Sequence, residues 1–75
     1  MNTFEKICSL INERFDISET VLSPETTWEE IGVDSIDLVD LISEIEDTFD
    51  ISVPDEAIED LRTIGDVATF VETLC

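Results

Sequence analysis

The sequence predicts an all-α protein, a small four-helix bundle of three longer helices plus one short helix with a long loop between helices one and two. Three observations support this fold. Apolar residues recur at helical spacing in three separate segments, and each segment begins with a side chain that can cap a helix. The period-two alternation that a strand needs is confined to Ile51-Ser52-Val53. At 75 residues, the chain is expected to form one domain over residues 1–75.

The first helix is expected from about Thr3 to Phe15. Asn2 and Glu5 have the spacing of a capping box, in which each side chain bonds the other residue's backbone N–H. Arg14 lies in the last turn, where its charge complements the helix dipole, so we interpret it as structural. The predicted apolar stripe consists of Phe4, Ile7, Cys8, Ile11 and Phe15.

Residues 16–33 lose the helical periodicity and are rich in serine and threonine, which indicates a long connection. Thr27 and Glu30 form another capping pair, and Gly32 is a helix stop, so one short helical turn is expected over Trp28–Ile31. Apolar residues should attach the connection to the core: Ile17, Val21, Leu22, Trp28 and Ile31.

The longest helix should begin with Ser35 in its first turn and end near Asp50. Asp34 is a good N-cap, and Asp37 has the position of its capping-box partner. The stripe facing the core is predicted to be Leu38, Leu41, Ile42, Ile45 and Phe49. At about 100° per residue, the opposite side is centred on Ile36, Asp40, Ser43 and Asp47. Ile36 is therefore predicted to be an exposed apolar residue on an acidic surface.

The remaining chain should form the short helix and the last helix. Val53-Pro54 favours an extended backbone, after which Asp55 is expected to cap the short helix. Its core-facing residues are predicted to be Ala57, Ile58 and Leu61. Thr63 with Asp66 should open the last helix, whose core-facing residues are predicted to be Ile64, Val67, Phe70, Val71 and Leu74.

Charge and cysteine usage limit the classes of partner. Twenty acidic against three basic residues give a net charge of −17, which argues against nucleic acid and membrane surfaces and favours basic protein partners. Cys8 lies on an apolar stripe and Cys75 is terminal, so no disulfide is expected. Without a recognisable signal peptide or membrane span, we expect a cytoplasmic monomer.

An enzymatic function is not expected, because the chain has no histidine and no tyrosine. Its many carboxylates should lie on exposed helix faces, which do not separate the pKa values of an acid–base pair. The segment from Asp47 to Asp55 lacks the central glycine of a calcium-binding EF-hand loop. No catalytic residue and no specific metal site are therefore predicted, although loose binding of divalent cations by clustered carboxylates stays open.

The tripeptide Asp34-Ser35-Ile36 resembles the Asp-Ser-Leu pattern in which acyl carrier proteins hold 4′-phosphopantetheine on a serine. Residues 46–56 resemble that family's acidic-Phe-Asp run closed by an aliphatic-Pro-Asp turn, and residues 63–67 resemble its entry to the last helix. The resemblance covers essentially the whole chain. It implies that a holo-carrier-protein synthase, a phosphopantetheinyl transferase, moves the group from coenzyme A onto Ser35. The arm would then present acyl chains as thioesters to fatty-acid synthesis enzymes.

The resemblance also implies a recognition surface for Lys and Arg patches on the transferase and on fatty-acid or polyketide synthesis enzymes. The matching acidic positions are Asp34, Asp37, Asp40, Glu46, Asp47 and Asp55. Glu44 lies on the same helix face by spacing, and Ile36, Ser43 and Val53 complete the expected set.

Two features keep other functions open. Ile36 replaces the more frequent leucine, and Ser43 stands where fatty-acid carriers often have methionine or another apolar residue. A dedicated carrier of a polyketide or other specialised pathway is therefore one alternative. An unmodified acidic adaptor that binds a basic partner is the other, and the intact mass of the protein distinguishes it from any carrier.

Overall fold

The computed structural model describes residues 2–74 and is all-α over that range. Its helices are α1 (Thr3–Phe15), α2 (Ser35–Phe49), α3 (Asp55–Ile58) and α4 (Ile64–Leu74). Two 3₁₀ turns, η1 (Glu19–Val21) and η2 (Glu29–Ile31), lie between α1 and α2. Within the described range no strand forms, and Thr27 and Thr63 make an isolated β-bridge. The predicted fold class is confirmed, whereas the expectation for Cys75 falls outside the described residues.

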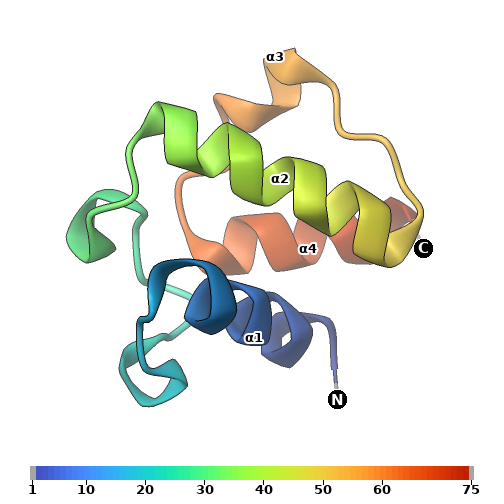
Figure 1. Ribbon diagram of the computed structural model, residues 1–75. Coiled ribbons are helices and arrows are strands. Elements are labelled where there is room, and N and C mark those ends of the chain that lie inside the picture. The colour runs from blue at the N-terminus through green and yellow to red at the C-terminus, as the bar shows by residue number, and fades with distance from the viewer. Residues whose placement is uncertain (1, 75) are drawn as a thin grey trace.

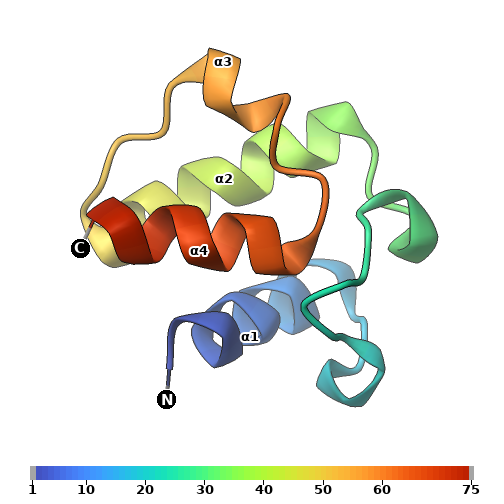
Figure 2. The ribbon, with the colours of Figure 1, turned by 180° about the vertical axis from the view of Figure 1, so that it is seen from behind.

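α1 packs against both α2 and α4, and it runs in the opposite direction to α2 (Figure 1). α3 lies on the other side of α2 and α4 from α1, as the reverse view also shows (Figure 2). The side chains at the centre of the bundle come from all three longer helices, with Ile7, Ile11, Leu41, Ile45 and Ile64 fully buried. None of the helices in residues 2–74 has the length and apolar character needed to cross a membrane.

The boundaries of α1 follow from its end groups. Asn2 Oδ1 accepts a hydrogen bond of 2.8 Å from the Glu5 N–H, and Glu5 Oε1 accepts one of 3.4 Å from the Asn2 N–H. The helix ends at Asp16, which adopts a left-handed conformation and donates its N–H to the Asn12 carbonyl at 2.9 Å. The predicted capping box and bounds are thus confirmed.

α2 also begins and ends where the sequence predicts. Asp34 Oδ1 accepts a 2.9 Å hydrogen bond from the Asp37 N–H, and Asp50 closes the helix with a φ of 55°. Within residues 2–74 only this half of the predicted capping box forms. No hydrogen bond joins the Asp34 N–H to the Asp37 carboxylate.

The long connection between α1 and α2 is held against the last part of the chain. The Ile64 N–H donates to the Thr26 carbonyl at 3.0 Å, and the Gly65 N–H donates to the Pro24 carbonyl at 2.9 Å. A Cβ at Gly65 would lie 2.7 Å from that carbonyl oxygen, so the close approach requires glycine. Leu22 and Trp28 are buried as predicted.

Three details differ from the sequence predictions. Val21 is exposed, because it ends the 3₁₀ turn η1, which buries none of its residues, and the contact with the core is made by the next residue, Leu22. Leu74 is also exposed, at the end of the α4 stripe. Asp55 is the first helical residue of α3 rather than its cap. Pro54 takes the cap position, and its carbonyl accepts a 3.0 Å hydrogen bond from the Ala57 N–H.

Candidate functional site

Ser35 is the first residue of α2, and its side chain is exposed. The chain turns into this helix at Gly32, whose φ of 75° is left-handed, and the Val33 N–H donates to the Trp28 carbonyl at 2.9 Å. Asp34 then takes an extended conformation and caps the helix. The predicted glycine stop and N-cap therefore present the serine hydroxyl at the tip of α2.

The segment before Ser35 is anchored to the body of the protein at Trp28. This side chain is buried, and its indole N–H donates to the Leu61 carbonyl at 2.9 Å. Glu30 Oε1 accepts hydrogen bonds of 3.0 Å from both the backbone N–H and the hydroxyl of Thr27. These bonds stabilise the charged carboxylate and lower the pKa of Glu30 below its usual value of 4.5. The serine is thus delivered by an ordered segment.

Two apolar side chains lie beside Ser35 on the surface of α2. Ile36 is 73% exposed, as predicted, and Val39 is 47% exposed. Together with Ser35 and Asp40 they line a shallow hollow of about 300 Å³. Sequence reasoning missed Val39, although its position three residues after Ile36 indicates a neighbouring place on the helix surface.

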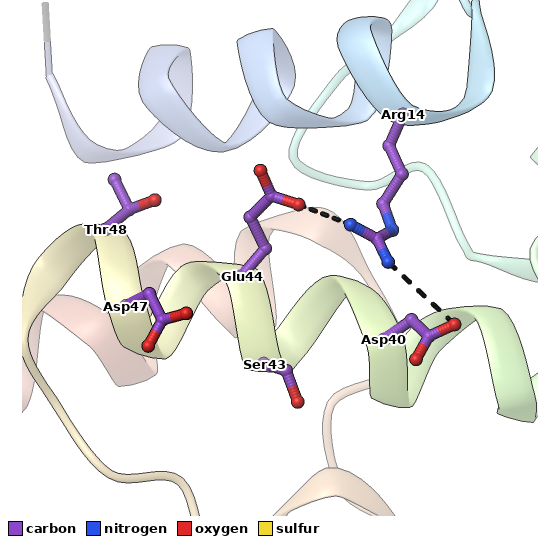
Figure 3. A pocket seen from close by; sticks show the side chains of 6 residues that line it. All are labelled: Arg14, Asp40, Ser43, Glu44, Asp47 and Thr48. Carbon is purple, nitrogen blue, oxygen red and sulfur yellow. Dashed lines mark hydrogen bonds and ion pairs between the residues drawn. The ribbon is translucent and has the colours of Figure 1, made fainter.

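The expected recognition residues of α2, most of them acidic, extend from this hollow along the helix. Asp34, Asp40, Ser43 and Asp47 are exposed, while Asp37 and Glu44 are partly buried. We call the following set the outer face of α2: Asp34, Ile36, Asp37, Asp40, Ser43, Glu44 and Asp47. Towards α1, part of it lines an open groove with Arg14 and Thr48 (Figure 3).

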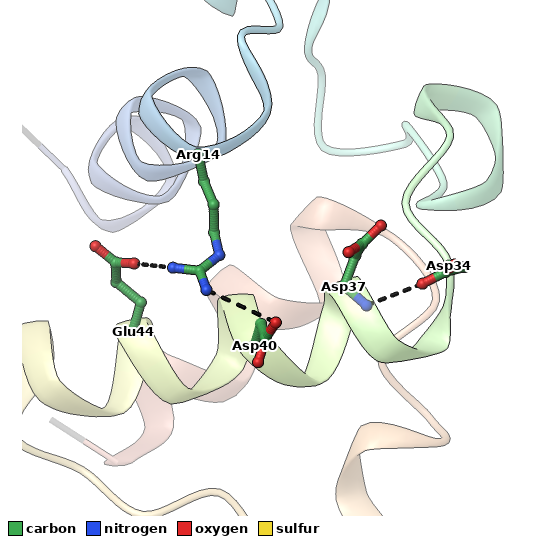
Figure 4. A network of polar contacts seen from close by, with 5 residues as sticks. All are labelled: Arg14, Asp34, Asp37, Asp40 and Glu44. Carbon is green, nitrogen blue, oxygen red and sulfur yellow. Dashed lines mark hydrogen bonds and ion pairs between the residues drawn. The ribbon is translucent and has the colours of Figure 1, made fainter.

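Arg14 places a positive charge on this acidic surface. Its guanidinium forms an ion pair with Glu44 through Nη1, and Nη2 lies 3.8 Å from Asp40 Oδ2 (Figure 4). The side chain therefore joins the last turn of α1 to two carboxylates of α2. The position of Arg14 in the helix is as predicted. Its pairing with Glu44 joins residues 30 apart in sequence, so the local sequence pattern contains no signal for it.

Glu46 and Val53, both expected on the recognition surface, contact each other instead. Glu46 Oε2 accepts a 2.7 Å hydrogen bond from the Val53 N–H. The Val53 side chain is 8% exposed and belongs to the core, since an apolar side chain is more stable there than in water. In this structure Val53 is not available to a partner. Asp55 is exposed at the start of α3.

Other reactive groups do not form a second site. Cys8 is buried in α1, where burial and the nearby carboxylates of Glu19 and Glu5 raise the pKa of its thiol from 9.0 to about 11. Such a thiol is protonated and unreactive near neutral pH. Within residues 2–74, no three cysteine or acidic side chains are grouped so as to hold a metal ion.

Comparison with known proteins identifies the family. Residues 5–71 match a family model described as phosphopantetheine attachment site. The chain is also 35% identical over 69 residues to an acyl carrier protein of Prochlorococcus marinus (strain MIT 9515), an overlap that covers 91% of this chain and 86% of that protein. Proteins of this kind are carriers rather than catalysts, and phosphopantetheine is their covalent cofactor. From the match over nearly its whole length and the helical bundle that accompanies it, we conclude that this chain belongs to the acyl carrier protein family.

Proposed function

We propose that Ser35 is the attachment point of 4′-phosphopantetheine and that the loaded chain presents acyl intermediates to fatty-acid synthesis enzymes in the cytoplasm. The observation that carries this proposal is the exposed hydroxyl of Ser35 at the first position of a capped helix, inside the matched family segment. The name of the curated relative supports the carrier role. Fatty-acid synthesis is the pathway that the resemblance favours.

The residues around Ser35 fit a phosphodiester. The N–H groups of Ser35 and Ile36 begin α2 and can face an anion in the way that helix N-termini bind phosphate, whereas the Asp37 N–H is already donated to Asp34. The positive end of the helix dipole offsets repulsion from Asp34 and Asp37. The hollow beside Ser35 is partly apolar, owing to Ile36 and Val39. When bound, the group supplies a flexible arm whose terminal thiol holds acyl chains as thioesters.

The chain itself contributes attachment and recognition. On modification the Ser35 hydroxyl loses its proton and its oxygen joins the phosphorus, which leaves coenzyme A's nucleotide part as the leaving group. Asp34, the carboxylate adjacent in sequence, accepts the Asp37 N–H through Oδ1 and caps α2, and we expect the transferase to supply the base. We expect the outer face of α2, together with Asp55, to meet basic patches on the transferase and the synthesis enzymes.

The decisive test is the intact mass after incubation with coenzyme A and a phosphopantetheinyl transferase. The wild-type chain should gain one phosphopantetheine group, and Ser35→Ala should gain none while keeping its helical circular dichroism. Ser43→Ala is the matched control, because Ser43 is another exposed serine of α2, and this variant should still be modified. A wild-type chain that stays unmodified by a transferase active on another carrier would support the unmodified adaptor instead.

Ser43 is the observation that favours the second candidate, a dedicated carrier for a polyketide or other specialised pathway. Its exposed hydroxyl leaves the middle of the outer face polar. Elongation assays with purified fatty-acid synthesis enzymes separate the two pathways. If the modified chain is not elongated under conditions in which a fatty-acid carrier is, the specialised pathway is the better assignment.

A further inference from the structure

The cations of α1 both lie against α2, although the chain has only three Lys and Arg residues in all. Lys6 Nζ is 5.7 Å from the centre of the Phe49 ring, at the far end of α2 from Ser35. Arg14 contacts Asp40 and Glu44, nearer to Ser35. Arg62, the third, forms no ion pair within residues 2–74. Arg14 is thus the cation that neutralises part of the outer face of α2.

The contact of Arg14 divides the outer face into two parts. Asp40 and Glu44 are one helical turn apart, and the guanidinium lies between them (Figure 4). Asp34 and Asp37 lie beyond Asp40 towards Ser35, and neither pairs with a cation within the described range. A guanidinium in this position satisfies the same two carboxylates that a basic side chain of a partner would seek.

The contact is also one that a partner can displace. The side chains of Arg14, Asp40 and Glu44 are 35%, 62% and 39% exposed, so water and salt screen their attraction. Ion pairs as exposed as these contribute little to folding stability. The main effect of Arg14 is therefore expected in the field that a charged partner meets rather than in the stability of the bundle.

We propose that Arg14 is a specificity-determining residue that competes with basic partner side chains for Asp40 and Glu44. Partners whose Lys or Arg patch uses these carboxylates, the phosphopantetheinyl transferase among them, must displace the Arg14 guanidinium, whereas partners that dock only on Asp34 and Asp37 need not. This inference rests on the proposed function, because it concerns the docking of enzymes that modify or use Ser35.

The test compares Arg14→Gln with Arg62→Gln in transferase assays, since each substitution removes one positive charge from the chain. At about 0.05 M salt, Arg14→Gln should raise kcat/KM for modification of Ser35 by at least about threefold, mainly through a lower KM, while Arg62→Gln stays within about 1.5-fold of wild type. The advantage should disappear at about 0.5 M salt. Equal effects of the two variants, or slower modification of Arg14→Gln, would overturn the proposal.

A double-mutant cycle with Glu44→Gln distinguishes masking from a general field effect. Because Arg14 already pairs with Glu44, Glu44→Gln should lower kcat/KM by a smaller factor in the wild type than in Arg14→Gln. In the Arg14→Gln background the same substitution should remove most of the gain. If Glu44→Gln has the same effect in both backgrounds, Arg14 does not mask Glu44 and the proposal fails.

A second readout does not depend on Ser35 modification. Tetralysine is titrated into the wild type, Arg14→Gln and Arg62→Gln, and the amide shifts of residues 40–47 are followed by NMR. Arg14→Gln should bind the peptide at lower concentrations than both other proteins. If the wild type is never modified, but Arg14→Gln binds tetralysine at lower concentrations than the other two proteins, the proposed function is refuted and the competition by Arg14 is still supported. Identical titrations would refute the competition alone.

Discussion

Ile36 and Val39 lie on the surface of α2 directly beside the serine that we propose as the attachment site, and their side chains are 73% and 47% exposed. Single exposed apolar residues are common and need no explanation. Here, however, the neighbouring exposed side chains are carboxylates, including Asp34 and Asp40. An apolar centre with a charged rim is the usual composition of a transient protein interface.

This arrangement predicts opposite effects for a surface and a core substitution in α2. Ile36→Ala should change the free energy of unfolding by less than about 1 kcal/mol, because the side chain is already in water, yet it should slow modification by the transferase. Leu41→Ala, at a fully buried position, should cost roughly 2 to 5 kcal/mol. Chemical denaturation and modification kinetics measure the two quantities. An Ile36→Ala variant that unfolds like the core control, or that is modified at the wild-type rate, would remove Ile36 from the recognition surface.

At the scale of elements, sequence patterns were most informative where the controlling contacts are local. The bounds of α1 and α2 follow from capping residues and from Asp16 and Asp50, which end them. The periodic stripes likewise identified most of the core. The pairing of Arg14 with Glu44 and of Glu46 with the Val53 N–H was not predictable, because each depends on how separate segments pack.

The same limit explains the changes to the recognition set. Spacing along α2 placed Asp40, Ser43 and Asp47 on the surface, where the structure has them. Val53 lies in an irregular connection, for which helical periodicity makes no prediction, and it turned out to be buried. Family resemblance pointed to Glu46 as an acidic position but contained no information about its backbone partner.

The contact of Glu46 predicts a structural role for this residue in the α2–α3 connection. Glu46→Ala should lower stability by about 1 kcal/mol and speed hydrogen exchange of the Val53 amide, since the N–H loses its acceptor. Glu46→Gln keeps an acceptor oxygen and should preserve most of that protection. Asp47→Ala is the matched control at an exposed position of the same helix. Unchanged exchange at Val53 in Glu46→Ala would show that the bond does not hold the connection in solution.

At the scale of the whole molecule, charge and size act against each other. A net charge of −17 is confined to a bundle with a radius of gyration of 11.0 Å. Within residues 2–74 the ion pairs are limited to those of Arg14. Most carboxylates therefore repel one another in the folded state and are separated on unfolding, which reduces the stability provided by the core.

Screening should relieve this repulsion and raise the midpoint of thermal unfolding. The Debye length falls to about 10 Å at 0.1 M salt, close to the radius of gyration of 11.0 Å, so most of the gain is expected between about 0.01 M and about 0.2 M sodium chloride. For a domain of this size, about 1 kcal/mol of relieved repulsion raises Tm by roughly 4–8 °C.

Magnesium should act at lower concentrations than sodium, because divalent ions accumulate more strongly near a polyanion. Since the described residues contain no cluster suited to a metal ion, the magnesium effect should rise gradually and be matched by enough sodium chloride. A Tm that is flat between about 0.01 M and about 0.2 M sodium chloride would mean that the carboxylates repel one another far less than their number implies. A sharp saturation of the Tm with magnesium alone would mean that a specific cation site exists.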